Sequence, residues 1–224
     1  MITLVFDTCF NKTYIVLKKD DEVLSNLVIE STDSNYHSVY LIPKIRDILV
    51  ENNLLMSDIN AIGVNIGPGS FTGIRAGITI ARVLAQQVNT KLVGVNSLQI
   101  LSKLNISTKK TIVATDARKN KVYYAEYNGN DEIVSPMLIE KEDLLAKIDE
   151  NVFVITDSSI SSFLKDNEII SLSYAAVDSN LGLYLSELVS LKLDDLQQDF
   201  HWAKLKPLYI QQPSITKPKE LKNV

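Results

Sequence analysis

The segment from residue 67 to residue 77 has the composition of a backbone turn that can hold an anion. It reads Gly67-Pro68-Gly69-Ser70-Phe71-Thr72-Gly73-Ile74-Arg75-Ala76-Gly77. Glycine permits a sharp turn, and the N–H groups in the first turn of a helix point outward, toward negative charge. We therefore expect a phosphate or nucleotide contact at the first four residues, which are Gly67, Pro68, Gly69 and Ser70. The segment also fits a tight strand-to-helix turn without a ligand, and it lacks the Gly-Lys-Ser/Thr of a Walker loop.

Asp7 and Thr8 form a second candidate for phosphate contact, because they end the apolar run that opens at residue 3. A carboxylate and a hydroxyl at a strand end can orient a phosphate or its magnesium ion. A polar stop to a buried strand accounts for the same pair, and the spacing alone favours that interpretation. A matching turn further along the chain, Asp116 to Asn120, contains no glycine, which argues against a complete nucleotide clamp.

The histidine and cysteine content argues against a transition-metal site. The chain has two widely separated histidines, His37 and His201, one cysteine, Cys9, and no His-x-x-x-His pair. We expect His37 to be a capping or surface residue. A serine peptidase lacks support as well, because no serine stands in a Gly-x-Ser-x-Gly elbow. We therefore nominate no catalytic residue and no metal ligand.

The helical pattern that follows the glycine segment has one face of small residues. Its members are spaced by four and so share one side of the helix. Glycine inside a helix costs about 1 kcal/mol relative to alanine, and a small face lets another backbone approach closely. That backbone can belong to the chain's own sheet or to a partner. We expect a partner interface on this face and on the preceding helix, formed by Leu41, Ile45, Ile48, Gly73, Gly77, Ala81 and Ala85.

The elements that position these residues occur twice along the chain. In each set a three-strand meander precedes a helix, a strand and a helix, and the first strand ends on an aspartate, Asp7 or Asp116. In the first set we expect strands at 3–7, 12–18, 22–29, 59–66 and 91–95, with helices at 38–52, 71–88 and 97–104, the last capped by Ser97. In the second set we expect strands at 111–116, 121–127, 132–139 and 152–156, with helices at 141–148 and 179–193. The repeat predicts two α/β lobes, residues 1–105 and residues 106–224, the second with a C-terminal tail.

Composition places the chain among ordinary globular proteins and argues against several classes of function. Hydrophobic residues make up 46% of the 224 residues, and no apolar run reaches the roughly 18 positions of a membrane span. The net charge of −4 argues against holding nucleic acid through a global positive field. The single cysteine fits a reducing compartment, and no secretory signal precedes the strand-like run that begins at Ile2. We therefore expect a cytoplasmic protein that does not engage a membrane.

The glycine segment resembles the signature of the TsaB (YeaZ) family, bacterial partner proteins in the biosynthesis of threonylcarbamoyladenosine in tRNA. Other stretches are similar to the same family: Leu4-Val5-Phe6-Asp7-Thr8, Tyr36-His37-Ser38, Gly94-Val95-Asn96-Ser97-Leu98, Asp116-Ala117-Arg118, Val122-Tyr123 and Lys206-Pro207-Leu208-Tyr209-Ile210. The resemblance spans nearly the whole chain, and the glycine segment is its most specific part. One departure is Gln211, where such proteins often have arginine; this argues against an anion contact at that position.

The resemblance implies an actin/Hsp70-like (ASKHA) fold with two duplicated α/β lobes, each a mixed sheet flanked by helices. It also implies a non-catalytic relative and partner of TsaD, the subunit that transfers threonylcarbamoyl to the adenosine next to the anticodon. TsaD requires paired metal-binding histidines, whereas this chain has only His37 near the matching region. The implied partners are a TsaD homologue and the ATPase TsaE, with tRNA reached only through the complex and a homodimer formed by the isolated chain. No intrinsic cofactor is implied, because ATP and magnesium belong to the complex with TsaD and TsaE.

Two other functions stay open on the residues alone. The first is a stand-alone enzyme of the actin-like class, such as an ATPase, a kinase or a carbamoyltransferase. It would need phosphate loops both at Asp7 and at the matching turn after Asp116. The second, less favoured, is a peptidase, for which the sequence offers no serine to nominate. The partner hypothesis accounts together for the glycine turn, the missing metal ligands and the small-residue helix.

Overall fold

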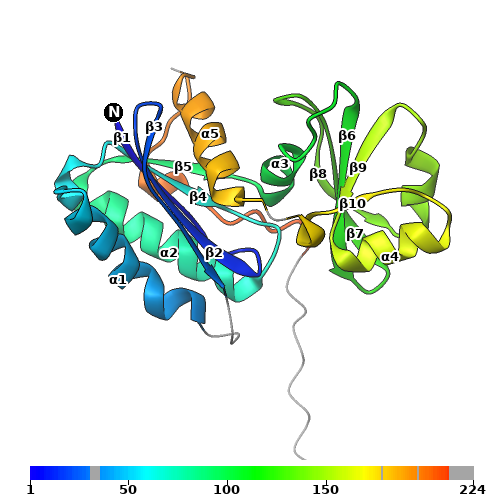
Figure 1. Cartoon of the computed structure of the whole chain (residues 1–224), viewed down its shortest axis with the longest axis horizontal. Coiled ribbons are helices and arrows are strands. Elements are labelled where there is room, and N and C mark those ends of the chain that lie inside the picture. Colours follow the sequence, from blue (N-terminus) through cyan, green and yellow to red (C-terminus); the bar gives the residue numbers. More distant parts are fainter. Residues whose placement is uncertain (31–35, 178, 196, 212–224) are drawn as a thin grey trace, which may run out of the picture.

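The computed structural model describes residues 1–30, 36–177, 179–195 and 197–211, without the side chains of residues 36–39. Within these ranges the chain forms two lobes, each built on a five-stranded sheet (Figure 1). The first sheet has the order β3-β2-β1-β4-β5, with β1 Ile2–Asp7, β2 Lys12–Lys19, β3 Glu22–Glu30, β4 Ala61–Asn65 and β5 Lys91–Val95. The second has the order β10-β9-β6-β7-β8, with β6 Lys110–Arg118, β7 Lys121–Asn128, β8 Asp131–Glu140, β9 Val152–Thr156 and β10 Leu172–Ser173.

The two sheets share one pattern of strand directions. β1 is antiparallel to β2 and parallel to β4, and β6 is antiparallel to β7 and parallel to β9. β1 and β4 are buried along nearly their whole length, which explains why both are apolar runs and not alternating ones. The repeated arrangement confirms the predicted fold class of two duplicated α/β lobes, each a mixed sheet flanked by helices.

Helices cover the sheets and connect the parallel strands. α1 (Tyr36–Glu51) and α2 (Phe71–Val88) lie side by side against the first sheet (Figure 1). α2 begins after the cap Ser70, whose hydroxyl accepts from the Gly73 N–H, and it ends at Asn89 in the left-handed conformation. The other helices are α3 Ser97–Ser102, α4 Ser158–Asp166 and α5 Leu181–Leu193, with the 3-10 helices η1 Met56–Asp58, η2 Glu142–Lys147, η3 Tyr174–Ala176 and η4 Trp202–Lys204. No helix in the described ranges combines the length and the hydropathy needed to cross a lipid bilayer.

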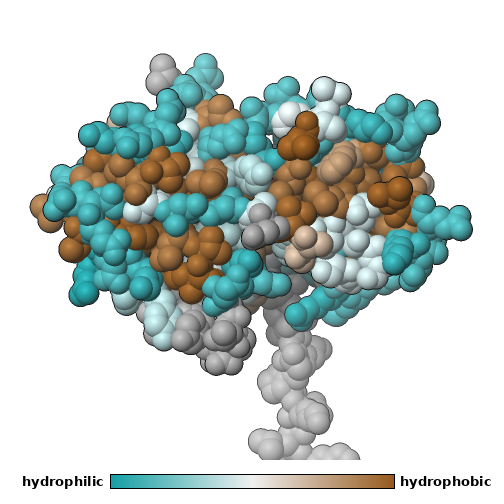
Figure 2. All heavy atoms as spheres, in the orientation of Figure 1, coloured by the Kyte–Doolittle hydropathy of each residue, from teal (hydrophilic) through white to brown (hydrophobic). Residues whose placement is uncertain are grey.

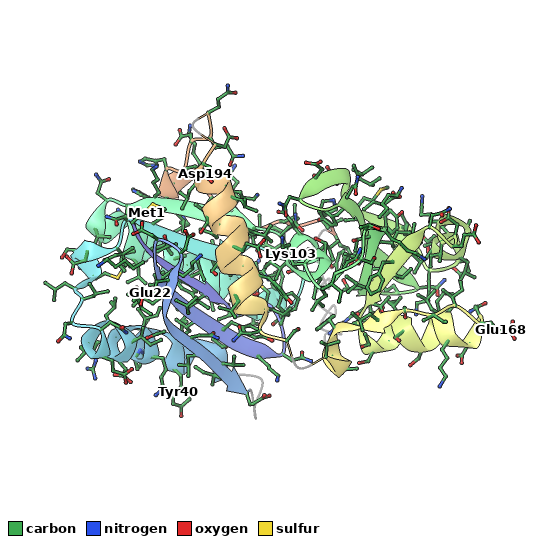
Figure 3. All side chains as sticks on the ribbon, turned by 45° about the horizontal axis from the view of Figure 1, so that its top comes forward. Met1, Glu22, Tyr40, Lys103, Glu168 and Asp194 are labelled. Atoms are coloured by element: carbon green, nitrogen blue, oxygen red, sulfur yellow. The ribbon has the colours of Figure 1, made fainter. Side chains whose placement is uncertain are left out.

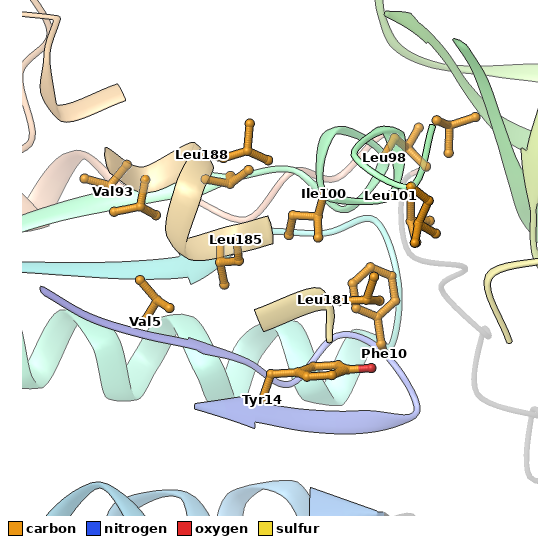
Figure 4. Packing of buried hydrophobic residues seen from close by; sticks show 14 of the residues in the cluster. Val5, Phe10, Tyr14, Val93, Leu98, Ile100, Leu101, Leu181, Leu185 and Leu188 are labelled. Carbon is orange, nitrogen blue, oxygen red and sulfur yellow. The ribbon is translucent and has the colours of Figure 1, made fainter. Parts of the chain in front are cut away.

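The last helix of each half packs against the sheet of the other half. α3, from the first half, contacts β6 and β7, whereas α5, from the second half, contacts β1, β2, β4 and β5. Gly63 makes the approach of α5 possible, because a Cβ at that position would lie 2.4 Å from a methyl group of Val189. Figure 4 shows side chains such as Val5 and Leu185 gathered where α5 crosses the first sheet. The two exchanged helices thus join both sheets in one continuous hydrophobic core.

Polar contacts also connect the lobes beside this core. The hydroxyl of Tyr127 in the second sheet donates to Asn96 Oδ1, the cap of α3, over 3.1 Å. Lys103 follows α3 and lies between the lobes (Figure 3), where its Nζ is 2.6 Å from Glu187 Oε1 on α5. The same ammonium group donates to Asn130 Oδ1 over 3.0 Å. The end of α3 is therefore tied both to the second sheet and to α5.

Most predicted elements are confirmed to within a few residues, and the helix at 71–88 agrees at both ends. α4 and β10 were not predicted, the helix expected at 141–148 is the 3-10 helix η2, and Asn96, not Ser97, caps α3. α4 is nine residues long, and four of them are serines, which have modest helix propensity. The helix forms because Asp157 caps it and because Ile160 and Leu164 are buried against the second sheet.

The C-terminal part of the chain returns to the first lobe. The predicted boundary near Asn105 assigns α5 to the second lobe, but the helix packs on the first sheet. Trp202 and Leu205 likewise pack against the core of the first lobe, beside α2. The division into residues 1–105 and residues 106–224 therefore describes the sequence repeat and not the packing of α5 and η4.

Candidate functional site

A cleft of about 850 Å3 lies between the two lobes. From the first lobe it is lined by the β1–β2 turn, at Phe10 and Asn11, and by the start of α2. From the second lobe it is lined by the β6–β7 turn around Arg118, by Asp157 after β9 and by Tyr174 of η3. Open α/β sheets bind their ligands at the carboxyl ends of strands. The cleft is therefore the candidate functional site of the fold.

Asp7 ends β1 beneath this cleft and is fully buried. Its Oδ1 accepts the Cys9 N–H over 2.6 Å, and its Oδ2 accepts Asn65 Nδ2 over 2.7 Å. Burial raises the pKa of the carboxyl to about 6, because the loss of solvent outweighs the stabilisation that these donors give to the charged form. Both oxygens are thus used inside the first lobe.

Thr8 is also buried, and the glycine segment packs directly against it. The Thr8 hydroxyl donates to the carbonyl oxygen of Gly73 over 2.7 Å, and the Ser70 N–H donates to the Cys9 carbonyl over 3.0 Å. A Cβ on Gly73 would lie only 1.8 Å from the carbonyl oxygen of Thr8. Gly73 is therefore required so that α2 can start against the β1–β2 turn.

The six predicted phosphate-contact residues fall into two groups. Asp7, Thr8, Gly67 and Pro68 are buried, whereas Gly69 and Ser70 are exposed and line the cleft. The alternative interpretations of a polar strand end and a tight strand-to-helix turn therefore hold for the buried residues, because their polar groups face the protein interior. A phosphate contact stays a prediction for Gly69 and Ser70.

Asn65 is a site residue that the sequence analysis missed. It ends β4 next to Asp7, and its Oδ1 accepts from both the Gly67 N–H and the Ser97 hydroxyl, each over 2.9 Å. Asn65 itself is completely buried. The available signal was a polar residue at the end of a buried strand, opposite Asp7 once β1 and β4 are paired in parallel.

The second lobe presents its polar groups to the cleft in a different way. The Asp116 N–H donates to Asp157 Oδ2 over 2.5 Å, while Asp157 Oδ1 accepts the Ile160 N–H and so caps α4. Arg118, Lys119 and Asn120 all adopt the left-handed conformation, with φ of 64°, 51° and 63°. The turn thus forms without glycine, and Arg118 and Lys119 line the cleft.

The predicted partner interface is wrong in its choice of residues, because the structure places all seven in the core of the first lobe. Their side chains or Cα atoms face the sheet or the facing helix, and the members are Leu41, Ile45, Ile48, Gly73, Gly77, Ala81 and Ala85. A Cβ on Gly77 would lie 2.6 Å from Thr8 Oγ1. The small face of α2 therefore serves the close approach of its own chain, at Thr8 of the β1–β2 turn and at β4, which was the alternative left open by the spacing.

The opposite side of α2 is exposed and carries an aromatic and cationic cluster. The guanidinium carbon of Arg75 lies 3.8 Å from the centre of the Phe71 ring, and Arg75 Nε donates to the Tyr209 hydroxyl over 3.0 Å. The cluster joins the start of α2 to the C-terminal segment. Gln211, where the sequence departs from the family pattern, lines the cleft nearby.

Neither histidine takes part in this site as far as the structure describes them. The backbone of His37 lies in the first turn of α1, and its side chain is outside the described residues. His201 Nδ1 accepts the Ala203 N–H over 3.2 Å, and its ring lies against Trp202. Among the described side chains, no group of three or more histidines, cysteines and carboxylates could hold a metal ion.

Comparisons with known proteins identify the family. The family described as "TsaD: tRNA N6-adenosine threonylcarbamoyltransferase" matches residues 22–188. The tRNA threonylcarbamoyladenosine biosynthesis protein TsaB of Escherichia coli K12 is 34% identical over 131 residues, which are 57% of this chain and 55% of that protein. TsaB of Buchnera aphidicola subsp. Schizaphis graminum is 28% identical over 152 residues, which are 66% of this chain and 70% of that protein.

A solved structure shows the same fold. YeaZ from Pseudomonas aeruginosa superposes with a TM-score of 0.76 at 20% identity, over 93% of this chain and 99% of that one. The chain spans little more than half the length of its E. coli relative in sequence, but nearly all of the Pseudomonas structure. The chain therefore belongs to the family of TsaD, tRNA N6-adenosine threonylcarbamoyltransferase, and within it to the TsaB (YeaZ) group.

Proposed function

We propose that this chain acts in the biosynthesis of threonylcarbamoyladenosine in tRNA, as a non-catalytic partner of a TsaD homologue. The ATPase TsaE would complete the assembly, ATP and magnesium would bind within that complex, and tRNA would be reached only through it. The modified base would be the adenosine next to the anticodon, and the assembly would work in the cytoplasm. The family match and the names of the TsaB relatives support this pathway.

The observation that carries the non-catalytic role is the internal use of Asp7 and Thr8. A catalyst of the actin-like class needs the polar groups at this turn to reach a phosphate or its metal ion. Here both oxygens of Asp7 accept from Cys9 and Asn65, and the hydroxyl of Thr8 donates to Gly73. The Asp7 carboxylate and the Thr8 hydroxyl therefore form hydrogen bonds inside the first lobe, whereas an enzyme of this class would use them to contact its substrate.

The partner surface that we propose is the outer side of α1 and α2, in place of their buried sides. Four apolar side chains there are each at least two fifths exposed: Ile42, Val50, Phe71 and Val83. Figure 2 shows apolar surface over the part of the first lobe that these helices form. A shallow groove of about 540 Å3 runs along α2 from Phe71 to Ile80. Exposed apolar groups on adjacent helices favour burial against another protein. If the homodimer and the TsaD complex both use this surface, the two assemblies compete for it.

The test is assembly with the TsaD homologue of the same cell. The two purified proteins are mixed and analysed by size-exclusion chromatography with light scattering. We expect a complex with one copy of each chain, and we expect the homodimer of this chain to disappear as the TsaD homologue is added. No complex at micromolar concentrations, or a complex that retains an intact homodimer, would contradict the proposal.

A stand-alone ATP-dependent enzyme is a second candidate, because the second-lobe side of the cleft is open. Arg118, Lys119 and the exposed Ser70 line this space, and such groups can contact phosphates. The candidate predicts ATP turnover by the isolated chain, dependent on magnesium and lost in Arg118→Ala. Turnover that is no faster than in the buffer, with parent and variant alike, removes it.

A further inference from the structure

A chain of buried hydrogen bonds runs from β1 through β4 to α3. Asp7 Oδ2 accepts from Asn65 Nδ2 over 2.7 Å, and Asn65 Oδ1 accepts from the Ser97 hydroxyl over 2.9 Å. The three side chains belong to residues that are no more than 1% exposed. A network of buried polar side chains is stable only when each polar atom has a hydrogen-bond partner. Each polar atom named here has such a partner.

Asn65, the middle residue of this chain, and Ser97, its far end, both hydrogen-bond to the backbone of Gly67. The Gly67 N–H donates to Asn65 Oδ1 over 2.9 Å, while the Gly67 carbonyl accepts the Ser97 N–H over 2.8 Å. Gly67 stands in the left-handed conformation, with φ of +95°. Ser70, three residues later, caps α2, and Ser97 is the first residue of α3. Gly67 thus ties the segment before α2 to the end of β4 through its N–H and to the start of α3 through its carbonyl oxygen.

This tie reaches across the lobes because α3 packs on the second sheet. α3 contacts β6 and β7, and its cap Asn96 accepts from Tyr127 of β7. The other end of the tie sets the first turn of α2, which carries Phe71 and Arg75 on its exposed side. The position of that exposed cluster is therefore linked to the second lobe through Gly67 and Asn65.

We propose that Asp7, Asn65 and Ser97 form a positioning relay that holds the start of α2 in register with α3 and the second lobe, and that a partner protein binds the surface so positioned. The second clause rests on the proposed function, whereas the first concerns this chain alone. The three residues are positioning residues and touch no substrate. Their role is to present the cluster at Phe71 and Arg75 in one fixed orientation.

The direction of the hydrogen bonds gives the relay a distinctive signature. Asp7 only accepts, and Asn65 donates to it while accepting from Gly67 and Ser97. In Asp7→Asn an amide group at position 7 faces the amide nitrogen of Asn65, so the acceptor of this hydrogen bond is lost. In Asn65→Asp two carboxylates face each other, so the donor is lost. The exchange Asp7→Asn with Asn65→Asp restores the bond between the two residues, because the new amide at position 7 can donate to the new carboxylate at position 65, which still accepts from Gly67 and Ser97. A general loss of packing would show no such rescue.

The experiment compares the parent, the two single variants and the exchanged pair. Amide hydrogen exchange of the isolated chain reports on residues 67–75 and 97–102, at a temperature where circular dichroism shows each variant folded. We expect exchange in both segments to be about tenfold faster in each single variant, the size that follows from one broken buried hydrogen bond. The exchanged pair should return to within about threefold of the parent. Single variants that exchange like the parent, or a folded exchanged pair no slower than the singles, would overturn the relay.

Affinity for the TsaD homologue, measured by calorimetry, is the second arm. We expect each single variant to bind about tenfold more weakly and the exchanged pair to recover. Single variants with faster exchange but parental affinity would overturn the claim that the partner binds the positioned surface. A parent that does not bind the TsaD homologue defeats the proposed function, and the exchange measurement then still decides the relay.

Ser97→Ala serves if the single variants do not fold, since it removes one hydroxyl and leaves the carboxylate paired. Ser102→Ala is its matched control, because Ser102 is equally part of α3 and buried, but its hydroxyl donates to Gln99 within the helix. Ser97→Ala should speed exchange at Gly67 and weaken TsaD binding, whereas Ser102→Ala should do neither. Equal effects of the two changes would contradict the relay.

Discussion

Asp7 and Asp116 occupy matching places in the two lobes, at or near the end of the central strand, and yet their surroundings differ. Each carboxylate accepts the N–H two residues later, from Cys9 over 2.6 Å and from Arg118 over 3.1 Å. Asp7 is sealed under the glycine segment, whereas Asp116 lines the cleft. The turn has the same local hydrogen bond in both lobes, but only the second lobe presents it to solvent.

The residue at the end of the neighbouring strand also differs between the lobes, because Asn65 ends β4 whereas Asp157 directly follows β9. In the first lobe Asn65 is buried like the rest of β4, and its amide nitrogen donates a hydrogen bond to Asp7. In the second lobe Asp157 can only accept, so it takes the backbone N–H of Asp116 and the first turn of α4. An amide closes the first site onto the interior, and a carboxylate leaves the second site open. Duplicated lobes can therefore keep one backbone plan while only one of them keeps an accessible polar turn.

The largest expected effect is the loss of stability caused by a side chain at Gly73, because the glycine segment packs tightly over Asp7 and Thr8. Gly73→Ala puts a methyl group 1.8 Å from the Thr8 carbonyl oxygen, and backbone must move to accept it. We expect urea unfolding to show a loss of about 3 kcal/mol or more. Ala76→Leu, on the outer side of the same helix, should change stability by less than about 1 kcal/mol. A Gly73→Ala variant as stable as the parent would show that the first site is not closed.

Burial of Asp7 predicts a particular dependence of stability on pH. Its pKa is about 6 in the folded chain and 3.8 in the reference state, so the folded state holds the proton more tightly. The resulting stabilisation is complete below pH 3.8 and is lost as the pH rises through 6, by about 3 kcal/mol at about 1.4 kcal/mol per pKa unit.

The measurement is the free energy of unfolding at several pH values between 4 and 7, for the parent and for Asp7→Asn. The parent should lose stability relative to the variant across this range, because only the parent has a carboxyl to ionise at this position. Parallel curves for the two proteins would mean that Asp7 is not buried as described.

The open second site should tolerate change better. Asp157→Ala removes the acceptor of the Asp116 N–H and the cap of α4, and we expect a loss of about 1–2 kcal/mol. Ser159 is the second residue of α4 and also lines the cleft. Ser159→Ala should cost less than about 0.5 kcal/mol of stability. Urea unfolding of both variants checks the order, and a larger loss for Asp157→Ala than for Gly73→Ala would reverse the comparison of the two lobes.

The smallest effect on stability is expected on the outer side of α2. Val83 is 56% exposed, so Val83→Asp should leave the unfolding free energy within about 0.5 kcal/mol of the parent. The same change should weaken both the homodimer and the TsaD complex, because it places a charge in the proposed apolar surface. Light scattering and calorimetry measure the two assemblies. Parental affinity in both would place the partner surface elsewhere.

The sequence predicted those elements whose signals are local. α2 was placed correctly because the glycine turn at residues 67–70 opens it and because its small residues recur every four positions from Gly73 to Ala85. The duplicated order of strands and helices was likewise visible, since each meander is joined by short turns. The sharp strand-to-helix connection at residues 67–70 was visible as well, and the structure confirms the connection, whereas a phosphate contact at Gly69 and Ser70 stays a prediction.

The features that the sequence did not predict depend on contacts between residues that lie far apart in the chain. Asn65 gains its role only when β4 lies beside β1, and Gly73 and Gly77 show their purpose only when α2 rests on Thr8. A small-residue face indicates a close approach but not which backbone approaches. The crossing of α5 to the first sheet has the same cause, because chain order does not state which sheet a late helix covers.

Reconstitution of tRNA modification tests the central claim most directly. The assay contains tRNA, ATP, threonylcarbamoyl-adenylate, the TsaD homologue and TsaE, with either no further protein, the parent chain or a cleft variant carrying Asp116→Ala and Arg118→Ala. Formation of threonylcarbamoyladenosine is followed by mass spectrometry of digested tRNA. We predict modification only when this chain is added, to a similar extent with the cleft variant, and none when the TsaD homologue is left out. Modification by this chain without the TsaD homologue, or its loss in a folded cleft variant that still binds TsaD, would contradict the account of a non-catalytic partner.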